Sequence, residues 1–461
     1  MRGGLRAALG SLTRRGRAVA AGGGTLLLLG ALLGERSLVQ LAVFVLALPL
    51  LSVLSVGRQR FRLSSRRTAT PSRVERGAPA DVLLEVTNTD RHPGGLWLLS
   101  EQLPADLGPA PRFVVERLGS RSSAPLHYRV RGARRGRHLL GPLRLRLVDP
   151  FGLVERTVTG TGTTPLLVLP RVRPLRGAGP AGGHGEGADG SRKAVAVHGE
   201  DDVSLRPYRH GDDLRKVHWR ATARTGELMV RLEERPWRSQ ATLLLDTRAR
   251  AHLLAGRRDG AVPVSPRGDP SPPPDSLEWL VEAAASIGTL LGRRGSVLRV
   301  VTDTGELRPA SGRGSLGPDE LLEQLALVRP SRATGLGPAV EELDRVAGEG
   351  PVVCLLGAVG PDDVDPLLRA RTGPATDVAV LADIGSWAEA GRGGPGAGRR
   401  GLSGAARAEL DRQREECAAL LRAAGWRVAT ARADLPVERV WTELVRGVGL
   451  PAGGPGVEVP A

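Results

Sequence analysis

The sequence RPYRHGDDLRKVHWRATARTGELMVR, residues 206–231, is a dense polar stretch between two regions of different pattern. It holds six arginines, two histidines, the adjacent pair Asp212 and Asp213, and Trp219. A strand-like apolar run, ATLLLD at 241–246, follows within a few residues. One interpretation of the stretch is a functional site or docking surface. Composition alone favours the other, a solvated loop and short helix with local ion pairs, because such ion-pair networks are common in structures.

The region after this stretch alternates continuous apolar runs with helical patterns. The alternation predicts an α/β domain over residues 240–450 with a doubly wound parallel sheet. The predicted strands are 241–246, 297–302, 352–356, 378–381 and 426–430. The predicted helices are 277–291, 318–327, 338–347, 405–424 and 437–446. Proline- and glycine-rich loops are expected at 262–275 and 391–401, and a disordered tail at 451–461.

The region before the stretch has the pattern of a β-sandwich, expected over residues 58–170. Short alternating runs separated by turn residues are typical of antiparallel sandwiches and barrels. In LRLRLVD, 143–149, leucines are expected to face the core and arginines the solvent. The basic turn RGARRGRH, 131–138, is able to contact phosphate, although a solvated hairpin tip is the commoner structure for such a run. A linker and the polar stretch fill residues 171–239, with a low-complexity segment at 177–190.

Two apolar runs near the start, 18–33 and 38–56, predict a transmembrane helical hairpin within residues 1–57. A spanning helix needs about 20 apolar residues, so the second run is long enough and the first is slightly short. Arginines flank the pair on both outer sides. This favours a two-pass plasma-membrane protein with both termini and the soluble domains in the cytoplasm. The alternative is a cleaved signal peptide, after which the second run would still anchor the protein but leave its bulk outside.

The chain of 461 residues has a net charge of +16, carried almost entirely by arginine. Such a charge is compatible with nucleic acid or with anionic lipid as a partner. Apolar segments lie beside the basic clusters and aromatic residues make up only 3% of the chain, so we expect the lipid bilayer and no nucleic acid. Cys354 and Cys417 form no metal-binding spacing and no disulfide framework, which suits a reducing compartment.

Two segments resemble a known bacterial family. RRGRHLLGPLRLRLVDPFGLVER (134–156), followed by LLVLP, and YRHGDDLRKVHWRATARTGELMVR (208–231) resemble the hallmarks of the family called domain of unknown function 58. They occur in the family's order, after a similar pair of membrane helices. The resemblance implies a von Willebrand factor A-like carboxy-terminal domain and partnership with a MoxR-type AAA+ ATPase. The residues of the second hallmark are Tyr208, Gly211, Asp212, Asp213, Arg215, His218, Trp219, Arg220, Arg224 and Leu228.

Von Willebrand factor A-like domains often hold a divalent cation at the carboxyl ends of the strands, where ligands collect in open α/β sheets. The resemblance requires Asp-x-Ser-x-Ser after the first strand, then a threonine, then an aspartate. Residues 246–250 read DTRAR, and arginine offers no oxygen ligand to a hard cation. Thr334 matches the threonine, but Gly357 lies near where the aspartate would fall. We therefore predict a degenerate metal site around Asp246 and Thr334, with no Mg²⁺ and no other cofactor.

Without a cation, Asp246 is expected to be an ordinary strand-end residue that pairs with Arg248 or Arg250. The sequence presents no convincing catalytic set. The preferred hypothesis is therefore a membrane-anchored cytoplasmic interaction or assembly factor. The family resemblance implies that such a factor works with a MoxR-type ATPase in the chaperone-like maturation of other proteins.

Under this hypothesis, residues 206–231 either clamp the sandwich to the α/β domain or dock a partner. Trp219 is expected to be largely buried, and Arg224 is expected to pair with Asp212 or Asp213. The alternative hypothesis is a metal-dependent or hydrolytic enzyme that uses Asp212, Asp213 and His218, because two carboxylates and an imidazole can bind a metal or transfer protons.

Overall fold

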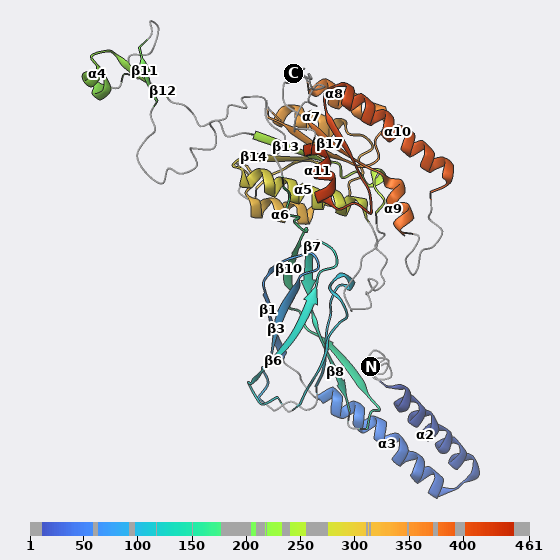
Figure 1. Cartoon of the computed structure of the whole chain (residues 1–461). Helices are drawn as coiled ribbons and strands as arrows, with labels where there is room; N and C mark the ends of the chain where they lie inside the picture. The colour runs from blue at the N-terminus through green and yellow to red at the C-terminus, as the bar shows by residue number, and fades with distance from the viewer. Residues whose placement is uncertain are drawn as a thin grey trace, which may run out of the picture.

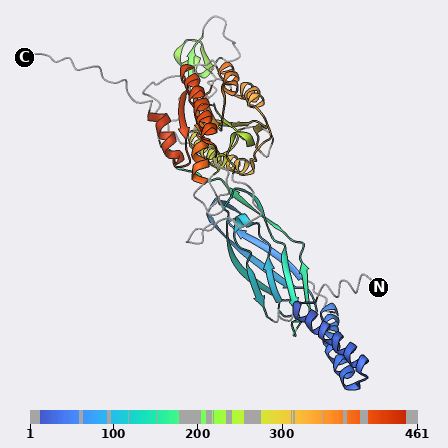
Figure 2. The ribbon, with the colours of Figure 1, turned by 90° about the vertical axis from the view of Figure 1, so that its right-hand side faces the viewer.

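The computed structural model describes residues 12–58, 63–91, 97–116, 118–149, 151–176, 204–208, 217, 219–232, 240–254, 275–309, 312, 315–347, 350–371, 377–391 and 402–446. Figures 1 and 2 show a pair of helices at one end, a region of sheet beside it, and an α/β domain beyond that. The predicted low-complexity segment at 177–190 and the predicted tail at 451–461 lie outside the described residues.

Two helices open the described chain, α2 (Arg14–Leu33) and α3 (Arg36–Arg58). The chain reverses at Gly34, whose φ of 70° is readily adopted by glycine. The helices pack closely, because a Cβ atom added at Gly23 would lie 2.8 Å from Leu46 Cγ. Many of their leucines are exposed. Both helices are long and apolar enough to cross a membrane, which agrees with the predicted hairpin.

The next region contains three small sheets. Their strands are β1 (Leu63–Thr70), β2 (Arg73–Glu75), β3 (Pro79–Asn88), β4 (Trp97–Glu101), β5 (Arg112–Val115), β6 (Ser123–Arg131), β7 (Gly136–Leu140), β8 (Leu143–Val148), β9 (Glu155–Thr159) and β10 (Thr164–Leu169). The sheet orders are β1-β3-β6, β2-β10-β7 and β5-β4-β8-β9. Pairing is antiparallel except between β2 and β10. A short 3-10 helix, η1 (Ala105–Leu107), follows β4.

The β1-β3-β6 sheet packs against the other two sheets through two apolar clusters. One joins β3 to β4 and β8 through Leu84, Val86, Trp97, Leu99 and Leu145. The other joins β3 to β7 and β10 through Ala80, Val82, Leu140, Leu166 and Val168. Sheets that face each other across a core form a sandwich. In β8, Leu143 and Leu145 are buried and Arg144 and Arg146 are exposed, which confirms the predicted alternation.

The carboxy-terminal domain is built on a six-stranded sheet in the order β15-β14-β13-β16-β17-β18. Its strands are β13 (Gln240–Leu245), β14 (Val297–Thr302), β15 (Gly305–Leu307), β16 (Val352–Leu356), β17 (Val378–Ala382) and β18 (Arg427–Ala431). All neighbours are parallel except β14 and the edge strand β15. The helices are α5 (Ser276–Arg293), α6 (Pro318–Leu327), α7 (Gly337–Val346), α8 (Pro361–Ala370), α9 (Ile384–Ala390), α10 (Gly404–Ala423) and α11 (Val437–Arg446).

Helices cover both faces of this sheet (Figure 1). Leu243 and Leu245 of β13 belong to the core under α5, α6 and α11, whereas Leu244 belongs to the core under α7, α8 and α10. Side chains alternate across a strand, so a strand buried on both sides is apolar throughout. The predicted strands and helices are confirmed to within two residues at each end. Helices α8 and α9 and strand β15 are additional elements.

Arginines of the sandwich bind glutamates on the helices of the α/β domain. Arg135, in the turn between β6 and β7, pairs with Glu278 of α5. Arg135 also donates hydrogen bonds to the carbonyl oxygens of Leu325 and Val328, at 3.0 and 2.9 Å. Its side chain is only 4% exposed. The expectation of a solvated hairpin tip at 131–138 is therefore wrong, because this turn is buried against the second domain.

Three further arginines extend the contact. Arg76 Nη2 lies 2.8 Å from Glu282 Oε2, and Arg173 Nε lies 2.7 Å from Glu282 Oε1. Arg73 pairs with a glutamate of α6. We call this set the interdomain clamp: Arg73, Arg76, Arg135 and Arg173 with Glu278, Glu282 and Glu323. Several charges in one network hold geometry better than an isolated surface pair does.

We expect Arg135→Ala to weaken the attachment of the two domains by about 2–3 kcal/mol, because it leaves two carbonyl oxygens without their buried donor and removes one of the two arginines that bind Glu278. Hydrogen exchange over residues 318–328 of the full chain in detergent should become faster. Arg137→Ala is the matched control, since Arg137 is an exposed arginine two residues further along. Equal exchange in both variants would show that the clamp contributes nothing to the attachment.

Candidate functional site

The carboxyl edge of the six-stranded sheet carries a buried polar cluster. Strands β13 and β16 are neighbours in the middle of the sheet, and the chain runs outward from them in opposite directions, to β14 and to β17. Ligands of open α/β sheets bind at such a switch point, beyond the carboxyl ends of the strands. Asp246 directly follows β13 and Gly357 directly follows β16. The cluster therefore occupies the place where this class of fold usually binds a ligand.

The guanidinium of Arg248 lies against both oxygens of the Asp246 carboxylate. Nε is 3.0 Å from Oδ1 and Nη2 is 3.0 Å from Oδ2, which is a bidentate, charge-assisted contact. The backbone N–H groups of Arg248 and Gly357 donate to the same carboxylate, at 3.1 and 3.2 Å. Both charged side chains are 0% exposed. The predicted pairing of Asp246 is confirmed, with Arg248 as its partner.

A second carboxylate binds the same guanidinium from the first turn of α8. Asp363 Oδ1 lies 2.9 Å from Arg248 Nη1. Burial lowers the pKa of Arg248, but the hydrogen bonds and negative charges of Asp246 and Asp363 outweigh it, so this pKa lies above its usual value. Arg248 therefore stays charged, and it supplies the positive charge that two carboxylates require at this edge.

A third carboxylate, Asp303, follows β14 at the same edge and is held by neutral donors. It accepts hydrogen bonds from Thr247 N at 2.8 Å, from Thr247 Oγ1 and from Ser331 Oγ. Asp303 and Ser331 are not among the site residues predicted from the sequence. A signal for Asp303 was present, because it directly follows the predicted strand 297–302 and parallel strands end at one edge. No comparable signal marks Ser331, which lies in an irregular segment.

His252 lies beneath this cluster as a structural residue. Its Nε2 donates to the carbonyl oxygen of Asp246 at 2.8 Å, and its Nδ1 accepts from Ser276 Oγ at 3.2 Å. Burial lowers the pKa of His252, so the ring is neutral at pH 7. Both ring nitrogens are engaged within the protein, which leaves neither of them to bind a ligand in this arrangement.

A cavity of about 10 Å³ lies beside Gly357 and Arg414, which is room for at most a single water molecule. Within the described ranges, no three His, Cys, Asp or Glu side chains are arranged to hold a metal ion. Thr334 is exposed, and no hydrogen bond among the described residues joins it to Asp246. The predicted lack of Mg²⁺ itself stays a prediction.

The polar stretch 206–231 contributes to a small unit of two strands and a helix. These elements are β11 (Ser204–Pro207), α4 (Trp219–Thr225) and β12 (Met229–Leu232). Tyr208 N donates to Leu228 O at 2.7 Å, and Met229 N donates to Thr222 Oγ1 at 3.0 Å. Of the predicted site residues, Gly211, Asp212, Asp213, Arg215 and His218 lie outside the described residues.

Trp219 is 68% exposed, so the prediction that it is largely buried is wrong. Val217 and Val230 are buried in the described part of the unit, whereas the seven-residue helix α4 has no buried residue. Arg220 and Arg224 are exposed, and Leu228 is 40% exposed. The predicted partners of Arg224 lie outside the described residues, and the clamp between the domains uses other side chains.

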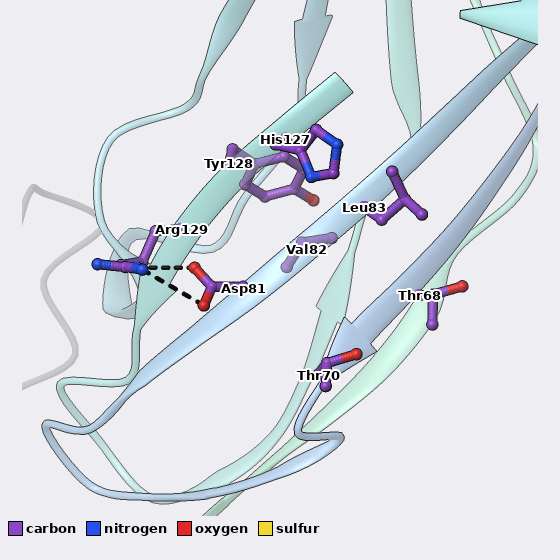
Figure 3. Close-up of a pocket in the computed structure, with 8 residues that line it drawn as sticks. All are labelled: Thr68, Thr70, Asp81, Val82, Leu83, His127, Tyr128 and Arg129. Atoms are coloured by element: carbon purple, nitrogen blue, oxygen red, sulfur yellow. Dashed lines mark hydrogen bonds and ion pairs between the residues drawn. The ribbon is translucent and has the colours of Figure 1, made fainter. Parts of the chain in front are cut away.

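A shallow hollow of about 490 Å³ lies on the β1-β3-β6 sheet (Figure 3). Asp81 and Arg129 at its edge pair with each other, with Nε 2.7 Å from Oδ1. The hydrogen bond from Arg129 lowers the pKa of Asp81. Both side chains are more than 60% exposed, and an exposed ion pair of this kind contributes little energy. We assign no function to the hollow.

The family model described as "Protein of unknown function DUF58" matches residues 204–260. The matched segment comprises the small unit, β13 and the residues around Arg248. This match supports the resemblance to that family. No curated protein matches the chain.

Some solved structures resemble parts of the chain. The CARDB domain of a Pyrococcus furiosus protein is 14% identical, with a TM-score of 0.18, over 23% of this chain and 93% of that chain. The putative ApaA protein of Bordetella pertussis is 12% identical, with a TM-score of 0.18, over 24% and 94%. The alkylpurine DNA glycosylase AlkC of Pseudomonas fluorescens is 11% identical, with a TM-score of 0.18, over 29% and 40%. Likenesses at these TM-scores support no conclusion about fold or function.

Proposed function

We propose that this protein is a membrane-anchored interaction factor whose small unit docks a partner protein through Trp219. The exposed indole carries the proposal, since it lies within the family-matched segment and is 68% exposed. Tryptophan and arginine contribute a disproportionate share of the binding energy at protein interfaces. Arg220 and Arg224 on the same helix are exposed beside it. The family resemblance nominates a MoxR-type AAA+ ATPase as the partner.

In this proposal the α/β domain is a von Willebrand factor A-like module in which Arg248 replaces the divalent cation. The sheet order and the place of Asp246 directly after β13 support the first part. The bidentate contact of Arg248 with Asp246 and its pairing with Asp363 support the second. A module of this kind acts by binding proteins. A catalytic role for Asp246 and Asp363 is disfavoured because both carboxylates pair with the guanidinium of Arg248.

The two helices α2 and α3 are the proposed anchor in the plasma membrane. Arginines precede α2 and follow α3, which favours the cytoplasmic side for both outer ends. The sandwich and the α/β domain then lie in the cytoplasm, where an ATPase is available. The interdomain clamp holds the α/β domain at the membrane-distal end of the sandwich (Figure 2).

Cross-linking in native membranes with ATP present tests the proposal. We expect the wild-type chain to capture an AAA+ ATPase, and Trp219→Ala to reduce that capture about tenfold or more, as for an interface residue worth about 2 kcal/mol. Val114→Ala is the control, because Val114 is an apolar residue of the sandwich that is 60% exposed.

If the wild-type chain captures no AAA+ ATPase, the proposed partner is wrong. If Trp219→Ala and Val114→Ala capture the ATPase equally, Trp219 has no role in docking. Metal-dependent turnover by the purified chain that Asp213→Ala abolishes would favour the enzyme hypothesis instead. Both variants must keep the melting temperature of the wild type for these comparisons to hold.

A further inference from the structure

One loop of the sandwich is tied to both membrane-candidate helices. It follows β8 in the motif VDPFGLVE, residues 148–155. Thr13 caps α2 and donates through its backbone N–H to Leu153 O at 2.9 Å. On the other helix, Ser52 Oγ donates to Asp149 Oδ2 at 2.9 Å. The loop therefore joins the start of α2 to the end of α3.

The attachment is tightly packed. Leu12, Leu153 and Val154 form an apolar cluster with side chains from both helices. A Cβ atom added at Gly16 would lie only 2.1 Å from Leu153 O, so α2 and the loop touch through their backbones. Asp149 is 5% exposed and also accepts hydrogen bonds from the backbone N–H groups of Phe151 and Val154. These contacts attach Asp149, Leu153 and Val154 to the two helices.

This loop also carries an exposed apolar side chain, that of Phe151. Phe151 is 66% exposed, although its neighbours Leu153 and Val154 are buried. Ser52, which binds the loop, lies inside the apolar run 38–56, four residues before its end. Four helical residues correspond to about 6 Å along the axis. On α3 the loop is thus attached within the apolar run, whereas on α2 it is attached at Thr13, five residues before the apolar run 18–33 begins.

We infer that Phe151 inserts into the interfacial layer of the lipid bilayer, at the boundary between headgroups and acyl chains. This inference rests on the proposed membrane anchor. Aromatic and aliphatic side chains of peripheral segments bury about 5–10 Å into that boundary. Arg14 and Arg15 at the start of α2 are exposed close to the loop and favour anionic headgroups around it. The loop thereby sets the angle at which the sandwich leaves the membrane.

Spin labels report this depth directly. The full chain, with Cys354→Ala and Cys417→Ala, is reconstituted into nanodiscs of phosphatidylcholine and phosphatidylglycerol. A nitroxide is then placed on Phe151→Cys, Thr159→Cys or Leu28→Cys. Thr159 is an exposed residue of the same hairpin, about 14 Å further along the strand from Glu155. Leu28 is 65% exposed on α2 and reports whether that helix is in lipid.

We expect the ratio of oxygen to nickel-chelate accessibility to be several-fold higher at position 151 than at position 159, and high at position 28. A low ratio at 151 with a high ratio at 28 would overturn the interfacial role of Phe151 and leave the anchor standing. Low ratios at both positions would overturn the anchor and the inference together. Matching melting temperatures of the three labelled chains show that the label has not unfolded the loop.

Discussion

Replacing Arg248 with methionine is expected to destabilise the α/β domain by about 3–5 kcal/mol. The substitution keeps most of the side-chain volume but leaves Asp246 buried without a counter-charge and removes a partner of Asp363. In the unfolded chain these carboxylates are hydrated with or without Arg248, so the substitution raises the free energy of the folded state only. Since 1.4 kcal/mol corresponds to a tenfold change, hydrogen exchange in β13 and β16 should accelerate by about 100-fold or more.

Arg250→Met is the matched control for this prediction. Arg250 lies two residues away in η3 (Ala249–Ala251) and is exposed, so the same chemical change should alter stability by no more than about 0.5 kcal/mol. A double variant that also carries Asp246→Asn should recover part of the loss, because the uncompensated charge is then gone. The idea that Arg248 acts as an internal cation fails if Arg248→Met exchanges as slowly as Arg250→Met.

Replacing Arg67 with methionine is expected to cost the sandwich a similar amount, about 3–5 kcal/mol. Arg67 Nε lies 2.5 Å from Glu101 Oε1, and the two side chains are 1% and 0% exposed. Arg67 also donates to Gly162 O at 2.9 Å. A Cβ atom at Gly141, whose φ is 91°, would lie 2.8 Å from Arg67 Cζ, so the guanidinium packs against the backbone between β7 and β8. Its removal would leave a buried carboxylate alone.

Hydrogen exchange over β1 and β4 measures this loss in the full chain. Arg66→Met serves as the control, because Arg66 is exposed on the opposite face of the same strand. Replacing Arg67 and Glu101 together with methionine and leucine should be far less harmful than replacing Arg67 alone. If the single and double variants are equally destabilised, the cost comes from lost packing and not from the stranded carboxylate.

The α/β domain was largely predictable because its strands are buried on both faces and its helices are amphipathic. Runs such as 352–356 contain only apolar residues, so pattern alone fixed their limits. The clamp was not predictable in this way. Arg135 looks like any arginine in a basic turn, and only the tertiary approach of α5 and α6 buries it. The local sequence does not show which carbonyl oxygens of a distant segment will accept hydrogen bonds from a guanidinium.

The candidate site was predicted in part. The arginines in DTRAR indicated an unusual strand end, and Asp246 does pair with one of them. Trp219 was misjudged because density of charge and aromatic residues suggests an interface between domains. In the described part of the small unit, Val217 and Val230 are buried and the indole of Trp219 is exposed.

The interdomain clamp has a mechanical consequence. A flexible joint between the sandwich and the α/β domain would let the outer domain swing when pulled. Guanidinium groups of the clamp bind α5 and the carbonyl oxygen of Val328 from the sandwich side, so bending at this joint would strain several charged hydrogen bonds together. A force applied to the α/β domain would therefore be transmitted along the sandwich and reach α2 and α3 through Thr13 and Ser52.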